Sequence, residues 1–332
     1  MNIKKVGLTA LAGSLVATSA FAGSLSLSGG AKMSYVTKEG TIVSGTASDN
    51  VASGISMDQE ISASGSGELD NGFTVTLTHG MNGMAASAGS DSSSITLGMG
   101  DLGTLSYDDT DGHGGLASLE DKMPKAYEEA NDGLGTTATK ATMAKMASGQ
   151  GFAYSNSVGD VALSIQFSDD LGATTNRTDG GQDTTAASSN SSSSVGLTYS
   201  MDAITVFGGV GTEGQADGKE IDHGTIGATY AFGPATVGYQ INDEDDSAAG
   251  GTDYETEIYA ISFMVNDSLS LSYGEHNTDK SGSAVDQEAE SIQASYSMGG
   301  MSINLKDSEM SGVAHTATNS HETTEILVTF AF

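Results

Sequence analysis

Residues 159–168, GDVALSIQFS, contain the pattern that decides the fold of this chain. After the Gly-Asp pair, the apolar residues Val161, Leu163, Ile165 and Phe167 alternate with small or polar ones. A period of two is typical of a β-strand with one apolar and one polar face. Gly and Asp tolerate the positive φ of a tight hairpin turn. The stretch therefore predicts a turn followed by an amphipathic strand.

The same two signals repeat along the chain. Alternating segments are joined by short turns and by longer polar stretches, and the two kinds of connection follow one another strictly. Seven short turns and eight long loops make fifteen connections, which predicts sixteen strands. The turns centre on 70–72, 101–103, 159–160, 201–202, 232–234, 266–267 and 299–300, and the loops are expected at about 37–53, 81–92, 109–149, 169–192, 211–221, 243–254, 277–287 and 310–320.

An even number of strands, with short turns at one end and long loops at the other, predicts a 16-stranded antiparallel transmembrane β-barrel. A bilayer admits a sheet only when it is closed, because an open edge would leave backbone groups unpaired. A barrel of this size is wide enough for an aqueous channel, so its polar faces would line water. A secreted, soluble all-β sandwich or repeat array is the alternative, but it does not explain the strict alternation of connections.

Both ends of the chain are typical of an exported membrane protein. Two lysines precede an apolar stretch that ends in an A-x-A cleavage site, so we expect residues 1–22 to be a signal peptide cut near Ala22. Residues 23–332 would then form the barrel. The last strand alternates and ends on Phe332, which resembles the assembly signal of Gram-negative outer-membrane proteins. The expected location is the bacterial outer membrane, as an integral protein.

The composition excludes several functions. The 332-residue chain has 12 Lys and Arg against 43 Asp and Glu, a formal net charge of −31, so a nucleic acid would be repelled. The chain has no Cys, which excludes disulfides and thiolate metal sites. It has neither the H-E-x-x-H spacing of a zinc enzyme nor a G-x-S-x-G nucleophile elbow. We therefore expect no catalytic residue and no enzymatic activity.

Three stretches carry a resemblance to a known family. They are DQEI at 58–61 with GELDNGF at 67–73, GDLGTLSYDDTD at 100–111, and MPKAYEEA at 123–130. Their order and spacing resemble the general porins of alphaproteobacteria, the Rhodobacter-type family of trimeric Gram-negative pores. The resemblance implies a homotrimer, passive diffusion of small solutes, and a third loop that folds into the barrel to form its constriction.

The third predicted loop, 109–149, is the longest and is net acidic. Without the resemblance, a solvated outer loop would be the simpler interpretation of its charges. With the resemblance, the loop carboxylates and Asp108, which directly precedes the loop, are expected to narrow the pore. The constriction residues that the resemblance implies are Asp108, Asp109, Asp111, Glu120, Asp121, Glu128 and Glu129.

The polar faces of the predicted strands supply few cations to the lumen. Pores of this general type usually set a cluster of basic side chains opposite the acidic loop, and this chain departs from that pattern. An acidic lumen concentrates cations, so we expect a cation-preferring pore. The alternative is that the acidity reflects a saline host, where screening would leave selectivity mild. The lumen-wall residues expected from the alternation are Lys32, Asp58, Glu60, Glu68 and Lys306.

An acidic run in the sixth predicted loop is the one candidate metal site. It consists of Asp243, Glu244, Asp245 and Asp246, whose carboxylate oxygens suit Ca²⁺. The run lacks the spacing of an EF-hand, so a solvated run of charge is the preferred interpretation and structural Ca²⁺ is the alternative. No other cofactor is expected.

These inferences converge on an outer-membrane porin, a water-filled channel for passive diffusion of small hydrophilic solutes and ions. Its expected partners are outer-membrane lipids, lipopolysaccharide and two further copies of the chain. Two rival functions are a substrate-specific channel with a solute site in the lumen, and a surface structural or adhesive barrel without transport.

Overall fold

The computed structural model describes residues 23–41, 53–82, 89–108, 114–134, 151–170, 190–215 and 219–332. Within these ranges, no helix combines the length and the apolar character needed to cross a membrane. The predicted signal peptide, 1–22, lies outside the described residues.

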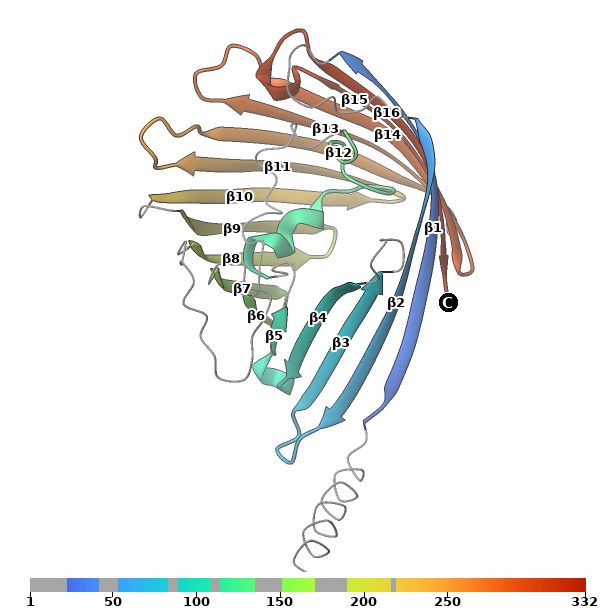
Figure 1. The fold of residues 1–332 in the computed structure, drawn as a ribbon. Helices are drawn as coiled ribbons and strands as arrows, with labels where there is room; N and C mark the ends of the chain where they lie inside the picture. Colours follow the sequence, from blue (N-terminus) through green and yellow to red (C-terminus); the bar gives the residue numbers. More distant parts are fainter. Residues whose placement is uncertain are drawn as a thin grey trace, which may run out of the picture.

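The described residues form sixteen antiparallel strands that close into one barrel (Figure 1). The predicted strand number and fold class are confirmed, and each strand pairs with the next along the chain. Three short 3-10 helices accompany them: η2 (Gly100–Leu102), η3 (Gly115–Lys122) and η6 (Val313–His315). The strands are β1 (Leu25–Thr41), β2 (Gly54–Glu68), β3 (Thr74–Asn82), β4 (Gly89–Gly98), β5 (Thr104–Asp108), β6 (Gly151–Val158), β7 (Val161–Asp170), β8 (Asn190–Met201), β9 (Ile204–Gln215), β10 (Lys219–Phe232), β11 (Ala235–Asp246), β12 (Tyr254–Asn266), β13 (Leu269–Lys280), β14 (Gln287–Met298), β15 (Met301–Ser311) and β16 (Ser320–Ala331).

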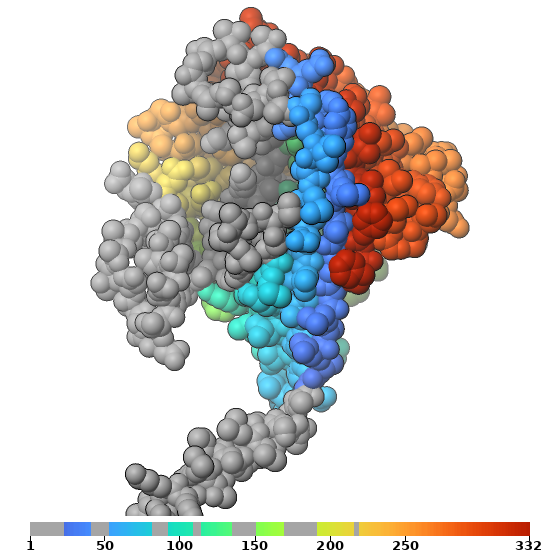
Figure 2. Space-filling view, turned by 45° about the vertical axis from the view of Figure 1, so that its right-hand side comes forward, coloured from blue at the N-terminus to red at the C-terminus, as the bar shows by residue number. Residues whose placement is uncertain are grey.

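The barrel closes where the first strand meets the last. β1 pairs antiparallel with β16 over a register that runs from Gly30 opposite Ala331 to Thr41 opposite Ser320. In Figure 2 this seam is the boundary between the blue and red strands. The final residue continues the ladder, since Phe332 and Gly29 exchange two backbone hydrogen bonds of 2.9 and 3.0 Å. Closure removes both sheet edges, as a bilayer requires.

Several connections are shorter than predicted because the strands run further. The loop expected at 211–221 shrinks to 216–218 between β9 and β10, and the one expected at 277–287 shrinks to 281–286. The predictions ended each strand where apolar alternation stopped. Alternation stops where one face no longer meets lipid, yet the backbone ladder continues beyond that point with both faces polar.

Apolar side chains face out and polar ones face in, the reverse of a soluble barrel. Ile55 on β2 is 84% exposed and Ile226 on β10 is 63% exposed, and both lie on the outward face. The alternating inward positions carry mostly Ser, Thr, Asn and Gln. The outward face therefore suits hydrocarbon and the inward face suits water.

Candidate functional site: a segment inside the barrel

Residues 114–134 lie inside the barrel, where Figure 1 shows η3 and the chain that follows it. They contact inward-facing side chains of strands between β7 and β16, which alternate along each strand with the outward apolar side chains. This stretch is the described part of the predicted third loop. It runs along the inner wall in two parts, which are attached to the wall by different kinds of contact.

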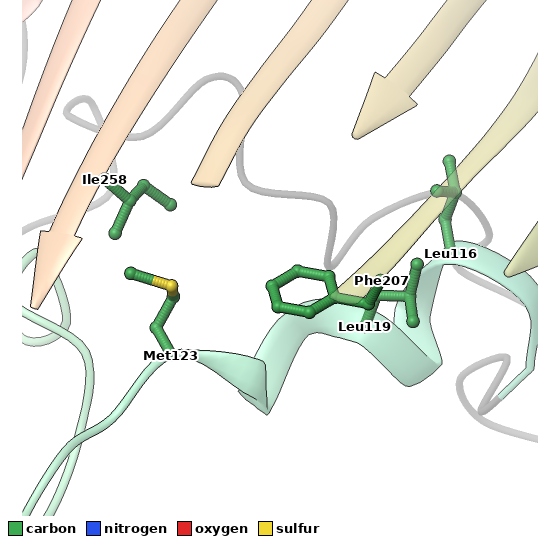
Figure 3. Packing of buried hydrophobic residues seen from close by; sticks show 5 residues of the cluster. All are labelled: Leu116, Leu119, Met123, Phe207 and Ile258. Carbon is green, nitrogen blue, oxygen red and sulfur yellow. The ribbon is translucent and has the colours of Figure 1, made fainter. Parts of the chain in front are cut away.

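The first part is attached by apolar packing. Leu116, Leu119 and Met123 form one buried cluster with Phe207 of β9 and Ile258 of β12 (Figure 3). Leu116 is fully buried and none of the five is more than 5% exposed. Phe207 and Ile258 occupy inward positions that would otherwise meet water. The segment and these wall residues therefore shield each other from the lumen.

Inward glycines make room for the segment. A Cβ at Gly209 would lie 2.8 Å from Leu116 Cδ2, and one at Gly238 would lie 2.6 Å from Pro124 Cδ. Real Cβ atoms do not approach so closely, so larger residues there would push the segment away from the wall. Two wall hydroxyls also accept hydrogen bonds from its backbone, Ser164 from Gly115 N at 2.9 Å and Ser194 from Leu116 N at 3.0 Å.

The second part is attached by polar contacts to its backbone. Ser272 Oγ accepts a hydrogen bond from Ala126 N at 2.9 Å. Gln293 Oε1 accepts from Tyr127 N and Glu128 N at 3.1 and 2.9 Å, and its Nε2 donates to Glu128 O at 2.6 Å.

Lys306 and His321 extend this polar attachment towards β16. Lys306 Nζ donates to Glu129 O at 2.6 Å and to Asp132 O at 2.9 Å. His321 Nδ1 contacts Leu134 O, where the described part of the segment ends. The second part is thus bound by side chains of four adjacent strands, β13 to β16.

The segment carries a cluster of charged side chains inside the lumen. Asp121 and Glu129 flank Lys125, which forms ion pairs with both, the Glu129 pair at 3.9 Å. Burial, the largest cause, raises the pKa of the Glu129 carboxyl to about 8, against the opposing pull of Lys125. Burial also raises the pKa of Glu120, with nearby Asp121 adding to the effect. For Lys125, burial lowers the pKa, but the hydrogen bond to Asp121 and nearby carboxylates leave it above its ordinary value.

The structure brings together four of the seven predicted constriction residues, Glu120, Asp121, Glu128 and Glu129. Asp108 is instead the last residue of β5, on the wall, because the strand continues one residue into the acidic run. Asp109 and Asp111 lie outside the described residues.

Sequence reasoning did not place Asp132 in the constriction, and of the wall residues that bind the segment it named only Lys306. Asp132 is exposed on the segment; its charge contributes to the acidity of the predicted loop, but it was not among the residues expected to narrow the pore. Gln293 and Ser272 stand at ordinary inward positions, so alternation marks them as lumen-facing but not as partners of a loop. No signal in the sequence separates them from other polar wall residues.

The predicted wall residues occupy different environments. Lys32 of β1 and Asp58 of β2 are register partners on the inward face, and Lys32 is exposed there. Glu60 lies on the same face two residues along. Glu68 faces inward eight residues further, about 26 Å away at the turn end of β2. Lys306 also faces inward, but the segment covers it and leaves it 3% exposed.

A polar recess lies between η3 and the wall formed by β5 to β8. It has a volume of about 550 Å³. Hydroxyl groups of Ser118, Ser155, Ser164 and Thr198 line it, together with Lys122 of the segment. Asp101 of η2 also lines the recess, so this corner presents one ammonium group, one carboxylate and several hydroxyls.

The acidic run considered for Ca²⁺ lies at the end of β11, not in a loop. Strand alternation divides it: Asp243 and Asp245 face outward, whereas Glu244 and Asp246 face inward. The four carboxylates therefore do not converge. Among the described residues, no group of three or more His, Cys, Asp or Glu side chains is arranged to hold a metal ion.

The family model for Gram-negative porins matches residues 7–306. The chain belongs to the Gram-negative porin family. This porin thus fits the outer membrane, where its relatives form channels, and the resemblance seen in its sequence is confirmed. None of the curated proteins compared with it matches the chain.

Solved porin structures share the fold. A variant of the Rh. blastica porin is 19% identical with a TM-score of 0.63, and the match covers 93% of this chain and 100% of that one. A porin refined at 1.8 Å is 15% identical with a TM-score of 0.66, covering 93% and 100%. The anion-selective porin from Comamonas acidovorans is 12% identical with a TM-score of 0.65, covering 93% and 99%. At these identities the likeness establishes the fold alone.

Proposed function

We propose that this porin is a passive channel for small hydrophilic solutes and ions and that it prefers cations. The observation that carries the proposal is the charge of the segment inside the barrel. Residues 114–134 hold two Lys and five carboxyl groups, Glu120, Asp121, Glu128, Glu129 and Asp132, so their formal charge is 2 − 5 = −3 with all five ionised and −2 while Glu129 is neutral. The barrel supplies the water path, and transport needs no catalytic step.

The sign of the selectivity follows from which charges reach the water. Lys306 is covered and lies 3.7 Å from Glu128, so it cancels one carboxylate and offers little positive charge to the lumen. Asp121 pairs with Lys125 but is 79% exposed, so its carboxylate still contacts the water of the lumen. A low-dielectric wall focuses such a field and raises the local cation concentration. The fold does not fix this sign, since the similar porin from Comamonas acidovorans is anion-selective.

Single-channel recording of the purified, detergent-folded protein in planar bilayers tests the proposal. Under a KCl gradient we expect ohmic steps and a reversal potential of cation-selective sign. Asp121→Asn should reduce that preference, because it removes an exposed carboxylate. A reversal potential of anionic sign would overturn the cation preference.

The same recordings separate the rival functions. Current that saturates and is blocked by one solute would favour a substrate-specific channel. Folded barrels without conductance would favour a structural or adhesive role.

We also propose that the porin assembles as a homotrimer through the outward face of β1 to β4. On this face His79 of β3, flanked by Leu77 and Met81, contacts Ser93 Oγ of β4 at 2.8 Å. Gln59 of β2 also points outward between apolar neighbours. Polar groups at membrane depth are costly against lipid and usually face protein. A second copy of the chain would cover them.

A pair of tryptophan substitutions tests this surface. Ala63 of β2 is the register partner of His79 of β3. Ala63→Trp should block the close approach of a second copy and shift the protein from trimer to monomer in native mass spectrometry. Ala228→Trp, on the outward face of β10, is the matched control and should leave the oligomer unchanged. Disruption by the control alone would assign the contact to the other side of the barrel.

A further inference from the structure

The polar attachment of the segment follows one register row of the wall. Ser272 of β13 is the register partner of Gln293 of β14, which in turn is the partner of Lys306 of β15. Along the segment, Ala126 binds Ser272. Tyr127 and Glu128 bind Gln293. Glu129 and Asp132 bind Lys306. The chain therefore crosses three strands in order, with one wall side chain on each.

These side chains recognise backbone, not side chains. Ser272 and Gln293 bind N–H groups, and Gln293 and Lys306 bind carbonyl groups. Backbone recognition fixes where residues 126–134 run, whatever side chains they carry. The acidic side chains then project from a path that the wall has set.

Lys306 is suited to this task by its donors. An ammonium group has three N–H donors, and here two carbonyl oxygens lie within 2.9 Å and the Glu128 carboxylate at 3.7 Å. A buried charge is costly unless it is paired, so the burial of Lys306 is tolerated only while the segment stays in place. The exposed Lys32, at an inward position of β1, has no such covering.

We propose that Gln293 and Lys306 are positioning residues that hold residues 126–134 against the wall and thereby set the largest solute that the channel passes. The proposal rests on the proposed channel function and adds which wall residues determine its size limit. Loss of either residue frees the second part of the segment while the apolar cluster still holds the first. The pore then fluctuates and admits larger solutes.

Neutral polyethylene glycols of graded size are the probe, because their entry into an open channel lowers its conductance without an electrostatic contribution. Gln293→Ala changes no charge, so a higher size limit with noisier open-channel current can come only from the released segment. Lys306→Gln should act in the same way, and Lys306→Arg should restore much of the parent size limit because it keeps the charge and donors.

Two matched variants separate positioning from other effects. Asn304→Ala removes a buried inward amide on the same strand as Lys306, one that bonds Ser295 of the wall at 2.6 Å, and should leave the size limit unchanged. Lys32→Gln should shift the reversal potential and leave the size limit unchanged.

The outcomes distinguish this proposal from the channel function. A conducting parent whose size limit is unaltered by both Gln293→Ala and Lys306→Gln would overturn the positioning role alone. A folded parent that does not conduct would overturn the proposed function and the size limit with it. Should Lys306→Gln fail to fold, Gln293→Ala decides by itself.

Discussion

The two parts of the segment inside this porin are attached by opposite chemistry. Around Leu116 and Leu119 the contact is apolar and dry, and glycines in the wall give the backbone room to approach. From Ala126 to Leu134 the contact consists of hydrogen bonds to backbone. The difference shows how a polar lumen can hold a chain in place: a small apolar cluster packs against one part, and polar side chains form hydrogen bonds to the backbone of the other.

The largest effect is expected from removing the apolar anchor. Leu119→Ala should cost about 2–5 kcal/mol of attachment, as for other buried leucines. Because the chain has no Cys, Met123→Cys gives a single thiol at a site that is 5% exposed. In that background Leu119→Ala should raise the labelling rate by a thiol reagent at least about tenfold. Leu271→Ala, at an outward position of β13, is the control, and equal rates for both variants would contradict the anchor.

A smaller effect is expected where the two parts join. Gly238→Ala places a Cβ about 2.6 Å from Pro124, so the segment must move towards the lumen. The single-channel conductance should fall. Gly224→Ala, on the neighbouring strand β10, meets open space and should leave the conductance unchanged. Unchanged conductance in both variants would show that the wall, not the segment, gives way.

A third prediction concerns the pH dependence of selectivity. The raised pKa of Glu129, about 8, leaves this carboxyl mostly neutral below that pH and ionised above it. The constriction therefore gains one negative charge as pH rises through 8, and cation preference should increase. Reversal potentials measured on both sides of this pH check the sign. Glu129→Gln should remove the step, and a step that persists in that variant would assign it to another group.

The smallest effect is expected at the turn end of β2. Glu68 lies about 26 Å along β2 from Glu60, well beyond the screening length of about 8 Å at physiological salt. Glu60→Gln should therefore change the reversal potential more than Glu68→Gln does. Equal shifts would mean that the whole wall, not the constriction, sets selectivity.

Much of the fold could be predicted because each strand of a membrane barrel has a lipid-facing and a water-facing side, which gives its sequence a period of two. Each strand shows lipid and water in turn, so Val161 to Phe167 reveal both faces of β7. Strand ends were less predictable. Asp243 to Asp246 and Asp108 belong to strands that extend beyond the apolar belt, where alternation carries no information.

The sequence by itself determined the closed barrel, the direction of most strand faces and the excess of carboxylates over cations. Those properties depend on neighbours along the chain and on composition. Only the tertiary structure decided that Lys306 is covered while Lys32 is exposed, and that Gln293 binds a segment more than 160 residues away, its contact with Glu128 being 165 residues distant. Alternation tells which side of a strand a residue occupies, but not what lies against that side. That depends on where a distant loop packs, which is set by contacts between residues far apart in the sequence.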